Sequence, residues 1–396
     1  MTILLDYRPA VKQRSGVGEY VHELAAALVS TLAPADRLLL FTSSWRDRPD
    51  SRLARDWPLT RVIDRRVPVR VLNAAWHRLA WPPVEWFVGQ SIDISHSLHP
   101  LLLPTHSGRT VVTVHDLDFL RHPERTTAEV RRDYAALVRR HVTRADLVVV
   151  NSRSTARDVE RELHVASGRI VVCRPGVPRW AQHGRPARPE GGGYVLFVGT
   201  LEPRKNVPGL LDAWARLATL EPDLPLLKLA GTSTSAADAW LRRLEEPPLA
   251  GRVEHVGYVP DAGRRALYEG ARLLVLPSFH EGFGLPALEA MALGVPVVAS
   301  DCGALPEVIG DAGLLVSPGD PAALAATIRR VLTDDALARE LSTRGLSRAA
   351  GFSWHAAART LRDAYHGLAG SPGAVQGPVH ATGAASAASS DDAHRR

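Results

Sequence analysis

The stretch ARLLVLPSFHEGFGLPALEAMALGVPVVAS, residues 271–300, decides the fold. Its first part, 271–278, is a continuous apolar run typical of strands buried on both faces of a parallel sheet, and 295–300 is a second such run. Between them a glycine-rich loop is followed by Pro286, which suits the first turn of a helix. A strand, a helix and a second strand in this order predict one βαβ unit of a parallel sheet.

Short apolar runs alternate with amphipathic runs through the rest of the chain in the same way. Strands are predicted at 3–7, 37–42, 67–72, 92–97, 110–115, 146–151, 169–173, 194–199, 226–231, 253–258, 271–278, 295–300 and 313–318. Helices are predicted at 18–30, 126–143, 152–164, 206–220, 261–271 and 321–333. Because the set occurs twice, the sequence predicts an α/β protein with two doubly wound, Rossmann-like domains that face each other across a cleft.

A segment rich in Pro, Gly and Arg, 179–193, is predicted to link the two domains. The N-terminal domain is then predicted over 1–178 and the C-terminal domain over 194–353. An amphipathic stretch at 354–369 predicts a closing helix. The Ala/Ser/Gly-rich residues 370–396 have scarcely a large apolar side chain and are predicted to be disordered.

The bulk composition is that of a globular cytoplasmic protein. The chain has 396 residues, of which 45% are hydrophobic and 23% are charged. Its two cysteines, Cys173 and Cys302, are too few for a disulfide framework and predict a reducing compartment. No run of about 18 apolar residues occurs, and the N-terminus lacks the features of a signal peptide, so neither a membrane span nor secretion is expected.

Positive charge is concentrated in the first half of the chain. Residues 1–178 hold 26 Lys and Arg against 19 Asp and Glu, a net charge of +7 that contrasts with −1 for the remainder. This asymmetry fits either an ordinary solvated surface or an anionic partner such as a phosphorylated acceptor or a lipid surface. No nucleic-acid-binding module is recognisable, so nucleic acid is not expected. The aromatic cluster 74–87, with Trp76, Trp81 and Trp86, fits core, an acceptor-side wall or an interfacial anchor.

Two cations lie at a strand–loop–helix turn in the second half. The strand that starts at 194 ends at Gly199, and Arg204 and Lys205 directly precede the helix that begins near Asn206. An anion here would meet both side chains and the positive end of a helix dipole, which suits a diphosphate. The alternative is a surface pair without a ligand.

Two glutamates flank the glycine-rich loop of the opening stretch. Glu281 lies in the loop and Glu289 lies about one turn into the following helix. Gly282 and Gly284 permit close backbone approach to a ligand and present N–H groups to it. Because carboxylates accept hydrogen bonds from vicinal hydroxyls, the two glutamates suit a polyol held at both ends. Glu289 also fits a helix-start acid that only complements the dipole.

The first half contributes further candidates at its predicted strand ends. Gly16 and Gly18 precede a helix and could form a phosphate-facing turn, although the loop is too long and lacks the third glycine of a dinucleotide-binding motif. His115 ends a strand at the cleft and could donate a hydrogen bond to a sugar or a leaving phosphate. Asp116 and Asp118 resemble a metal-binding pair, but no third ligand is evident and no metal site is expected.

Together these motifs resemble retaining glycosyltransferases of family 4, which have the GT-B fold. The resemblance extends to about residue 370 and rests on RKN at 204–206, on Glu281 and Glu289 eight positions apart within 277–300, and on GVGEY (16–20) and VHDL (114–117). It implies a nucleotide diphosphate sugar as the donor substrate and no cofactor or metal.

The resemblance also implies roles for the site residues. Glu289 is expected to bind the ribose hydroxyls. Glu281 is expected to bind hydroxyls of the transferred sugar, beside the backbone N–H groups of Phe283, Gly284 and Leu285. Arg204 and Lys205 are expected to hold the diphosphate, which Gly16 approaches from the other domain. His115 is expected to contact the donor sugar near the reacting carbon.

The implied reaction moves a hexose-type sugar to an acceptor hydroxyl with retention of configuration. The implied mechanism is a front-face substitution in which the leaving phosphate helps to deprotonate the acceptor. GDP-mannose or a UDP-sugar is the expected donor, with mannosyl, glucosyl and rhamnosyl transfer into bacterial surface polysaccharide as the nearest parallels. The acceptor stays open among saccharides, lipid-linked saccharides and small molecules, and peripheral contact with an anionic inner membrane face is a further expectation. A nucleotide-sugar 2-epimerase of the same fold and an inactive sugar-nucleotide-binding protein are the alternatives.

Overall fold

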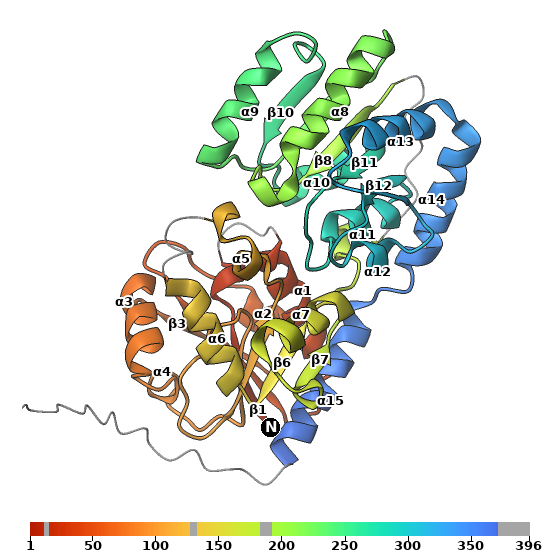
Figure 1. Ribbon diagram of the computed structural model, residues 1–396. Coiled ribbons are helices and arrows are strands. Elements are labelled where there is room, and N and C mark those ends of the chain that lie inside the picture. Colours follow the sequence, from red (N-terminus) through yellow and green to blue (C-terminus); the bar gives the residue numbers. More distant parts are fainter. Residues whose placement is uncertain (12–15, 127–132, 183–191, 371–396) are drawn as a thin grey trace, which may run out of the picture.

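The structure is a computed structural model, and it describes residues 1–11, 16–126, 133–182 and 192–370. Two parallel sheets form two domains that stack one above the other (Figure 1). The first sheet has the order β3-β2-β1-β4-β5-β6-β7 and the second has the order β10-β9-β8-β11-β12-β13. The predicted α/β fold with two facing Rossmann-like domains is confirmed.

The strands of the first sheet are β1 (Thr2–Asp6), β2 (Arg37–Ser43), β3 (Thr60–Arg65), β4 (Ile94–Ser97), β5 (Arg109–Val114), β6 (Leu147–Val150) and β7 (Ile170–Val172). Those of the second are β8 (Tyr194–Val198), β9 (Leu227–Ala230), β10 (Val253–Gly257), β11 (Ala271–Leu276), β12 (Val297–Ser300) and β13 (Leu314–Val316). All described strand pairs are parallel.

The helices that follow the strands of the first sheet are α1 (Val17–Val29), α2 (Leu53–Asp56), α3 (Val69–Ala74), α4 (Glu85–Val88), α5 (Asp118–Arg121), α6 (Ala135–Arg144) and α7 (Arg153–Leu163). Those after the start of the second sheet are α8 (Val207–Leu220), α9 (Asp238–Arg242), α10 (Asp261–Glu269), α11 (Leu285–Ala292), α12 (Leu305–Ile309), α13 (Pro321–Thr333), α14 (Asp335–Ala349) and α15 (Trp354–Gly370). None of the helices in the described ranges is both long enough and apolar enough to cross a membrane.

The strand order places the site. In each sheet the winding reverses beside the first strand, between β1 and β4 and between β8 and β11. At such a reversal the loops after the two strands leave in opposite directions, and the crevice between them is the usual ligand site of doubly wound sheets. In the second sheet those two loops are 199–206 and 277–284, which carry most of the predicted site residues.

The closing helix α15 packs on the first domain although it follows the second in sequence. Trp354, Leu361 and Tyr365 are buried in one core cluster with side chains of α1 and β1. Tyr365 also hydrogen-bonds His96, whose other ring nitrogen contacts Thr113 Oγ1 at 2.8 Å. The helix therefore ties the end of the described chain to the N-terminal sheet, as the continuous path in Figure 1 shows.

One predicted strand is wrong. Residues 67–72 were expected to be extended, but α3 begins at Val69, and the strand in this region is β3 at Thr60–Arg65. The Val-Pro-Val-Arg-Val alternation is typical of a strand, yet Val71 is 61% exposed and only Leu72 of this helix is buried. β3 lies at the edge of the sheet and needs few apolar residues. It therefore lacks the continuous apolar run by which the other strands were predicted.

Other predicted elements meet the edges of the described ranges. The predicted helix 126–143 is seen in its second part as α6, and 127–132 lie outside the described residues. The same holds for 183–191 of the predicted linker and for 371–396 of the predicted disordered tail. The helices α12 and α14 had not been predicted. The domain limits stay predictions.

Candidate active site

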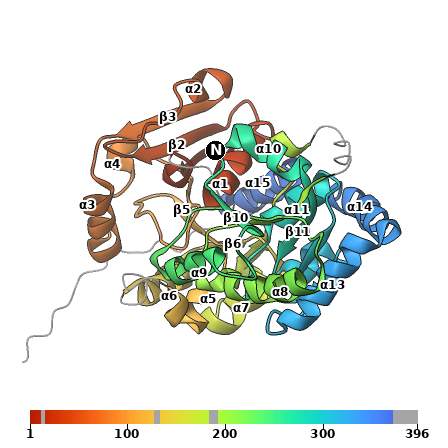
Figure 2. The same cartoon turned by 90° about the horizontal axis from the view of Figure 1, so that it is seen from above.

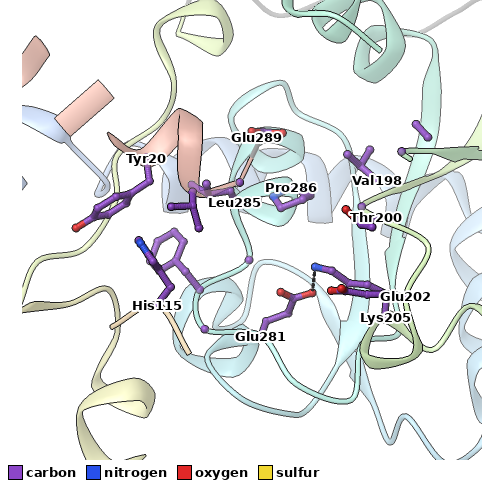
Figure 3. Close-up of a pocket in the computed structure, with 18 of the residues that line it drawn as sticks. Tyr20, His115, Val198, Thr200, Glu202, Lys205, Glu281, Leu285, Pro286 and Glu289 are labelled. Atoms are coloured by element: carbon purple, nitrogen blue, oxygen red, sulfur yellow. Dashed lines mark hydrogen bonds and ion pairs between the residues drawn. The ribbon is translucent and has the colours of Figure 1, made fainter. Parts of the chain in front are cut away.

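A cavity of about 420 Å³ lies between the domains, at the carboxyl ends of β8 and β11. In Figure 3 Tyr20 and His115 lie on one side of it and Lys205 and Glu202 on the other, with Glu281 and Glu289 between. Most of the predicted site residues line this cavity: Gly16, His115, Gly199, Arg204, Lys205, Glu281, Phe283, Gly284, Leu285 and Glu289. Gly18 is buried inside α1 and is not among the described lining residues.

Glu281 is the most heavily bonded carboxylate of the cavity. Its Oε1 accepts bonds from Lys205 Nζ and from Ser278 Oγ, each at 2.6 Å, and its Oε2 lies 3.2 Å from Arg204 Nη1. Burial alone would raise the pKa of Glu281, but the charges of Lys205 and Arg204 and the bonds to the carboxylate lower it to about 2. Glu281 is therefore ionised at any physiological pH and is held in one orientation.

The Arg204–Lys205 turn is anchored to the Glu281 loop by its backbone. Phe279 N–H donates to the Arg204 carbonyl at 2.9 Å. Asn206 caps the start of α8 in the left-handed conformation, with φ at 53°. Its side-chain amide donates to the Pro277 carbonyl at 3.1 Å. Asn206 thus serves to lock two loops together, which a sequence reading limited to the charged pair misses.

Arg204 itself is shared among three acceptors. Nη2 lies 2.8 Å from Glu202 Oε1, while Nη1 contacts both Glu281 and the His280 carbonyl, the latter at 2.9 Å. Burial opposes its charge, but Glu281 and the neighbouring carboxylates raise its pKa further above the ordinary value. Arg204 therefore stays cationic, as the predicted diphosphate role requires.

Glu289 lies at the other end of the cavity, on α11. Tyr268 Oη donates to its Oε2 at 2.5 Å, and Arg264 Nη2 donates to its Oε1 at 2.8 Å. Both partners are on α10, one turn apart, so that they share a helix face. Neither residue was among the predicted site residues, although their four-residue spacing on one predicted helix was the available signal.

Gly282 and Gly284 are each required by a different structural constraint. A Cβ on Gly282 would lie 1.8 Å from the His115 carbonyl oxygen, so this position lets the two domains touch. The sequence had suggested close approach to a ligand instead. Gly284 has φ at +101° as the residue before α11, a conformation that suits glycine. Pro286 has no N–H, and the Ala287 N–H donates to the Gly284 carbonyl at 3.0 Å, while Leu285 and Pro286 line the cavity.

On the N-terminal side, the first turn of α1 and His115 face the cavity. Gly16 precedes α1 with φ at +52°. His115 Nε2 lies 3.0 Å from the Leu98 carbonyl oxygen, which can only accept, so Nε2 carries the proton. Burial lowers the pKa of His115, and the neutral ring then offers Nδ1 as an acceptor. The sequence-based expectation that His115 donates a hydrogen bond to the donor stays a prediction; the Nδ1 atom would instead suit a hydroxyl that donates.

The aspartate pair of VHDL engages protein groups. Asp116 lines the cavity and its Oδ1 accepts from the Asp118 backbone N–H at 3.2 Å. Asp118 starts α5 and lies 3.6 Å from Arg125. Among the residues that the structure describes, no three His, Cys, Asp or Glu side chains are grouped so as to hold a metal ion.

Comparison with known proteins identifies the fold and the family. The model of "Glycosyltransferase Family 4" matches residues 14–179, and that of "Glycosyl transferases group 1" matches residues 192–334. The O-antigen chain mannosyltransferase B of Escherichia coli is 32% identical over 384 residues, which cover 92% of this chain and 99% of that protein. The chain is a member of glycosyltransferase family 4.

Solved structures agree with this glycosyltransferase in fold. Sucrose-phosphate synthase from Thermosynechococcus elongatus matches with a TM-score of 0.69 and 24% identity, covering 93% of this chain and 99% of that one. Anabaena HepE in complex with UDP-glucose matches with a TM-score of 0.67 and 18% identity, covering 93% and 100%. The two-domain GT-B architecture of the enzyme is thereby confirmed.

Proposed function

We propose that the enzyme transfers mannose from GDP-mannose to an acceptor hydroxyl of a growing surface glycan, with retention of configuration and without a metal ion. The observation that carries the proposal is the Glu281 carboxylate held by Lys205 and Arg204 at the start of two helices. This arrangement offers a sugar-binding acceptor directly beside two cations that suit a diphosphate.

The choice of sugar rests on the relative that matches over almost its full length. That protein is a mannosyltransferase of O-antigen chains, and it covers both domains of this enzyme. A UDP-sugar is the alternative donor, since HepE is seen with UDP-glucose. The base would lie near Thr232, Tyr258 and Val259, which line the cavity on the side of β9 and β10.

Catalysis in this proposal is electrostatic. As the bond from the sugar to the diphosphate breaks, negative charge grows on the leaving oxygen, where Lys205 Nζ and the Arg204 guanidinium are already oriented. The first turns of α1 and α11 add positive helix ends at the cavity. The leaving phosphate takes the proton of the acceptor hydroxyl, so no side-chain nucleophile is used.

The acceptor is proposed to be a lipid-linked saccharide reached at an anionic membrane. Trp81 and Trp86 are 54% and 63% exposed, and their rings contact each other at 5.3 Å between centroids. Leu79 is also exposed, as are Arg70 on α3 and Arg78. We call these five residues the Trp81–Trp86 surface; Figure 2 shows α3 and α4, the helices of this segment, at the edge of the N-terminal domain away from the C-terminal helices. Exposed indoles with flanking arginines suit an anionic lipid interface.

The test is nucleotide release from a panel of GDP-, UDP-, ADP- and dTDP-sugars by the purified enzyme with EDTA present. Slow hydrolysis of GDP-mannose alone is the expected result, followed by transfer with retained anomeric configuration once a mannose-terminated acceptor is added. Release from a UDP-sugar alone would replace the proposed donor. Thermal shifts with the free nucleotides follow on the same samples, and a lack of shift with every nucleotide would contradict the donor site itself.

A further inference from the structure

Arg264 joins carboxylates of the two domains at the donor cavity. Its Nη2 lies 2.8 Å from Glu289 Oε1 in the C-terminal domain, and its Nη1 lies 3.3 Å from Glu19 Oε2 on α1 of the N-terminal domain. The two glutamates are buried, and the arginine side chain is 12% exposed. The view from above shows α10, which carries Arg264, beside α1 (Figure 2).

The guanidinium of Arg264 also packs over an aromatic ring. Its Cζ lies 4.8 Å from the centroid of the Trp180 ring, and Trp180 belongs to the short helix Arg179–Ala181 that crosses between the domains. The Trp180 ring lies against Tyr268, with 5.8 Å between centroids, and Tyr268 binds the second oxygen of Glu289. Arg264 and Tyr268 therefore hold the two carboxylate oxygens of Glu289, and both of these side chains pack against Trp180 in the segment that connects the domains.

The charge balance of the cavity makes this arginine necessary. The described lining residues carry four carboxylates and three cations: Asp116, Glu202, Glu281 and Glu289, with Arg204, Lys205 and Arg264. Glu19 adds a further carboxylate behind the first turn of α1. Without Arg264 two buried glutamates would face an anionic donor with no cation between them, and each uncompensated buried charge is costly.

We propose that Arg264 couples closure of the domains to donor binding, as a positioning residue that bridges Glu19 and Glu289. The proposal rests on the proposed function, because it takes Glu289 to bind the donor ribose. A carboxylate has about four acceptor sites, so Glu289 can take ribose hydroxyls while it keeps Arg264 and Tyr268. Closure completes the Glu19 pair, which holds Arg264 and hence Glu289 in the orientation that the ribose needs. Donor binding then favours closure by the same free energy.

A double-mutant cycle in the full-length protein tests the coupling. Glu19→Gln and Arg264→Gln are made singly and together, and the Kd values for GDP and for UDP are measured by calorimetry. We expect Glu19→Gln to weaken binding of the preferred nucleotide about 3- to 10-fold and Arg264→Gln about 10- to 100-fold. In the Arg264→Gln background, adding Glu19→Gln should have no further effect.

Two controls separate coupling from a general loss of structure. Glu23→Gln removes another buried carboxylate of α1, which faces Arg179 at 3.7 Å, and should leave nucleotide binding unchanged. Arg264→Lys keeps the charge but cannot fork between two carboxylates, so it should bind nucleotide with intermediate affinity. If Arg264→Gln does not fold, Arg264→Lys takes its place in the cycle.

Small-angle scattering of the same samples reports domain closure directly. The nucleotide-free Glu19→Gln protein should have a larger radius of gyration than the wild type, and the preferred nucleotide should reduce the difference. Additive effects in the cycle, or unchanged scattering of Glu19→Gln, would overturn the coupling while the wild type still binds nucleotide. A wild type that binds neither GDP nor UDP would overturn the proposed function, and the coupling with it.

Discussion

The two domains hold their buried polar groups in different ways. At the cavity, the C-terminal domain pairs buried carboxylates with cations, as in Glu281 with Lys205 and Glu289 with Arg264. The N-terminal domain also has buried ion pairs, such as Asp6 with Arg8, but it adds histidines whose pKa burial lowers, to about 3 for His96 and to about 4 for His141 and the half-buried His77. The first arrangement concentrates paired charges at the cavity, and the second adds neutral imidazoles to the N-terminal domain.

The difference also shows where recognition is expected. The residues proposed to bind the donor come mainly from the loops after β8 and β11. The exposed Trp81 and Trp86, which are proposed to contact the membrane, belong to the N-terminal domain. If the two properties are separate, substitutions at the C-terminal side of the cavity should leave vesicle binding unchanged, and substitutions of Trp81 and Trp86 should leave donor hydrolysis unchanged.

Lys205→Ala should have the largest effect. Removal of one oriented cation from the leaving group should lower kcat about 100- to 1000-fold with little change in donor KM, as for other preorganised groups that act on developing charge. Arg204→Ala should act in the same direction. The measurement is steady-state transfer with both substrates varied. The control is Lys228→Ala, which removes a partly exposed lysine of β9 that is not among the described lining residues of the cavity. If Lys205→Ala weakened vesicle binding as strongly as it slows transfer, donor binding and membrane binding would not be separate properties of the two domains.

Glu289→Ala should mainly weaken donor binding. The change removes the acceptor of the ribose hydroxyls and leaves Arg264 and Tyr268 without their carboxylate, so the Kd should rise about 10- to 100-fold. Calorimetry with the nucleotide diphosphate measures it. The control is Glu340→Ala, which removes an exposed helix pair with Arg344. A fall in kcat with unchanged Kd would place Glu289 at the reacting end of the donor instead.

Acid should destabilise the N-terminal domain first. The folded-state pKa of His96, about 3, lies below its unfolded value of about 6.5, so its contribution is complete above pH 6.5 and is lost as the pH falls. The corresponding loss at Glu281, with a pKa of about 2, begins only near pH 4.5. Between pH 6.5 and 5, His96 alone should cost about 1–2 kcal/mol.

Urea unfolding at pH 7.5 and 5 measures this loss. His96→Asn should lower stability at pH 7.5, because it removes the bonds to Tyr365 and Thr113, but it should reduce the pH dependence. The exposed His355→Asn should change neither quantity. If the stability of His96→Asn depends on pH as strongly as that of the wild type, the buried imidazole of His96 is not the cause of the acid sensitivity.

The Trp81→Ser, Trp86→Ser pair should have the smallest effect. It should reduce binding to vesicles of anionic phospholipid about 3- to 10-fold, because two half-exposed indoles lose only part of their transfer free energy. Sedimentation with vesicles measures it, and Trp45→Ser, another exposed tryptophan of the same domain, is the matched control. Donor hydrolysis should stay at the wild-type rate. Equal binding by all three proteins would remove the membrane part of the proposal.

The alternation of strands and helices could be predicted from the sequence because each depends on local patterns. Continuous Val and Leu runs mark β6 and β11, and Pro and Gly mark the starts of α11 and α13. Reliance on local patterns also explains the error at 67–72, where valines alternate with other residues as in a strand although the segment is a largely exposed helix. The charged turn at 204–205 and the glutamates at 281 and 289 were found because each lies at a recognisable boundary between a strand and a helix.

The sequence by itself determined the two-domain α/β fold, the family, and those cavity-lining residues whose neighbours are close in sequence. Only the tertiary structure decided which strands adjoin, that α15 packs on the first domain, that His115 Nε2 contacts the Leu98 carbonyl, and that Gly282 meets the His115 carbonyl. It also decided that Arg264 reaches Glu19, a residue 245 positions away. Local patterns arise from the period of one helix or strand, whereas pairing across domains depends on how two separately folded surfaces are set against each other.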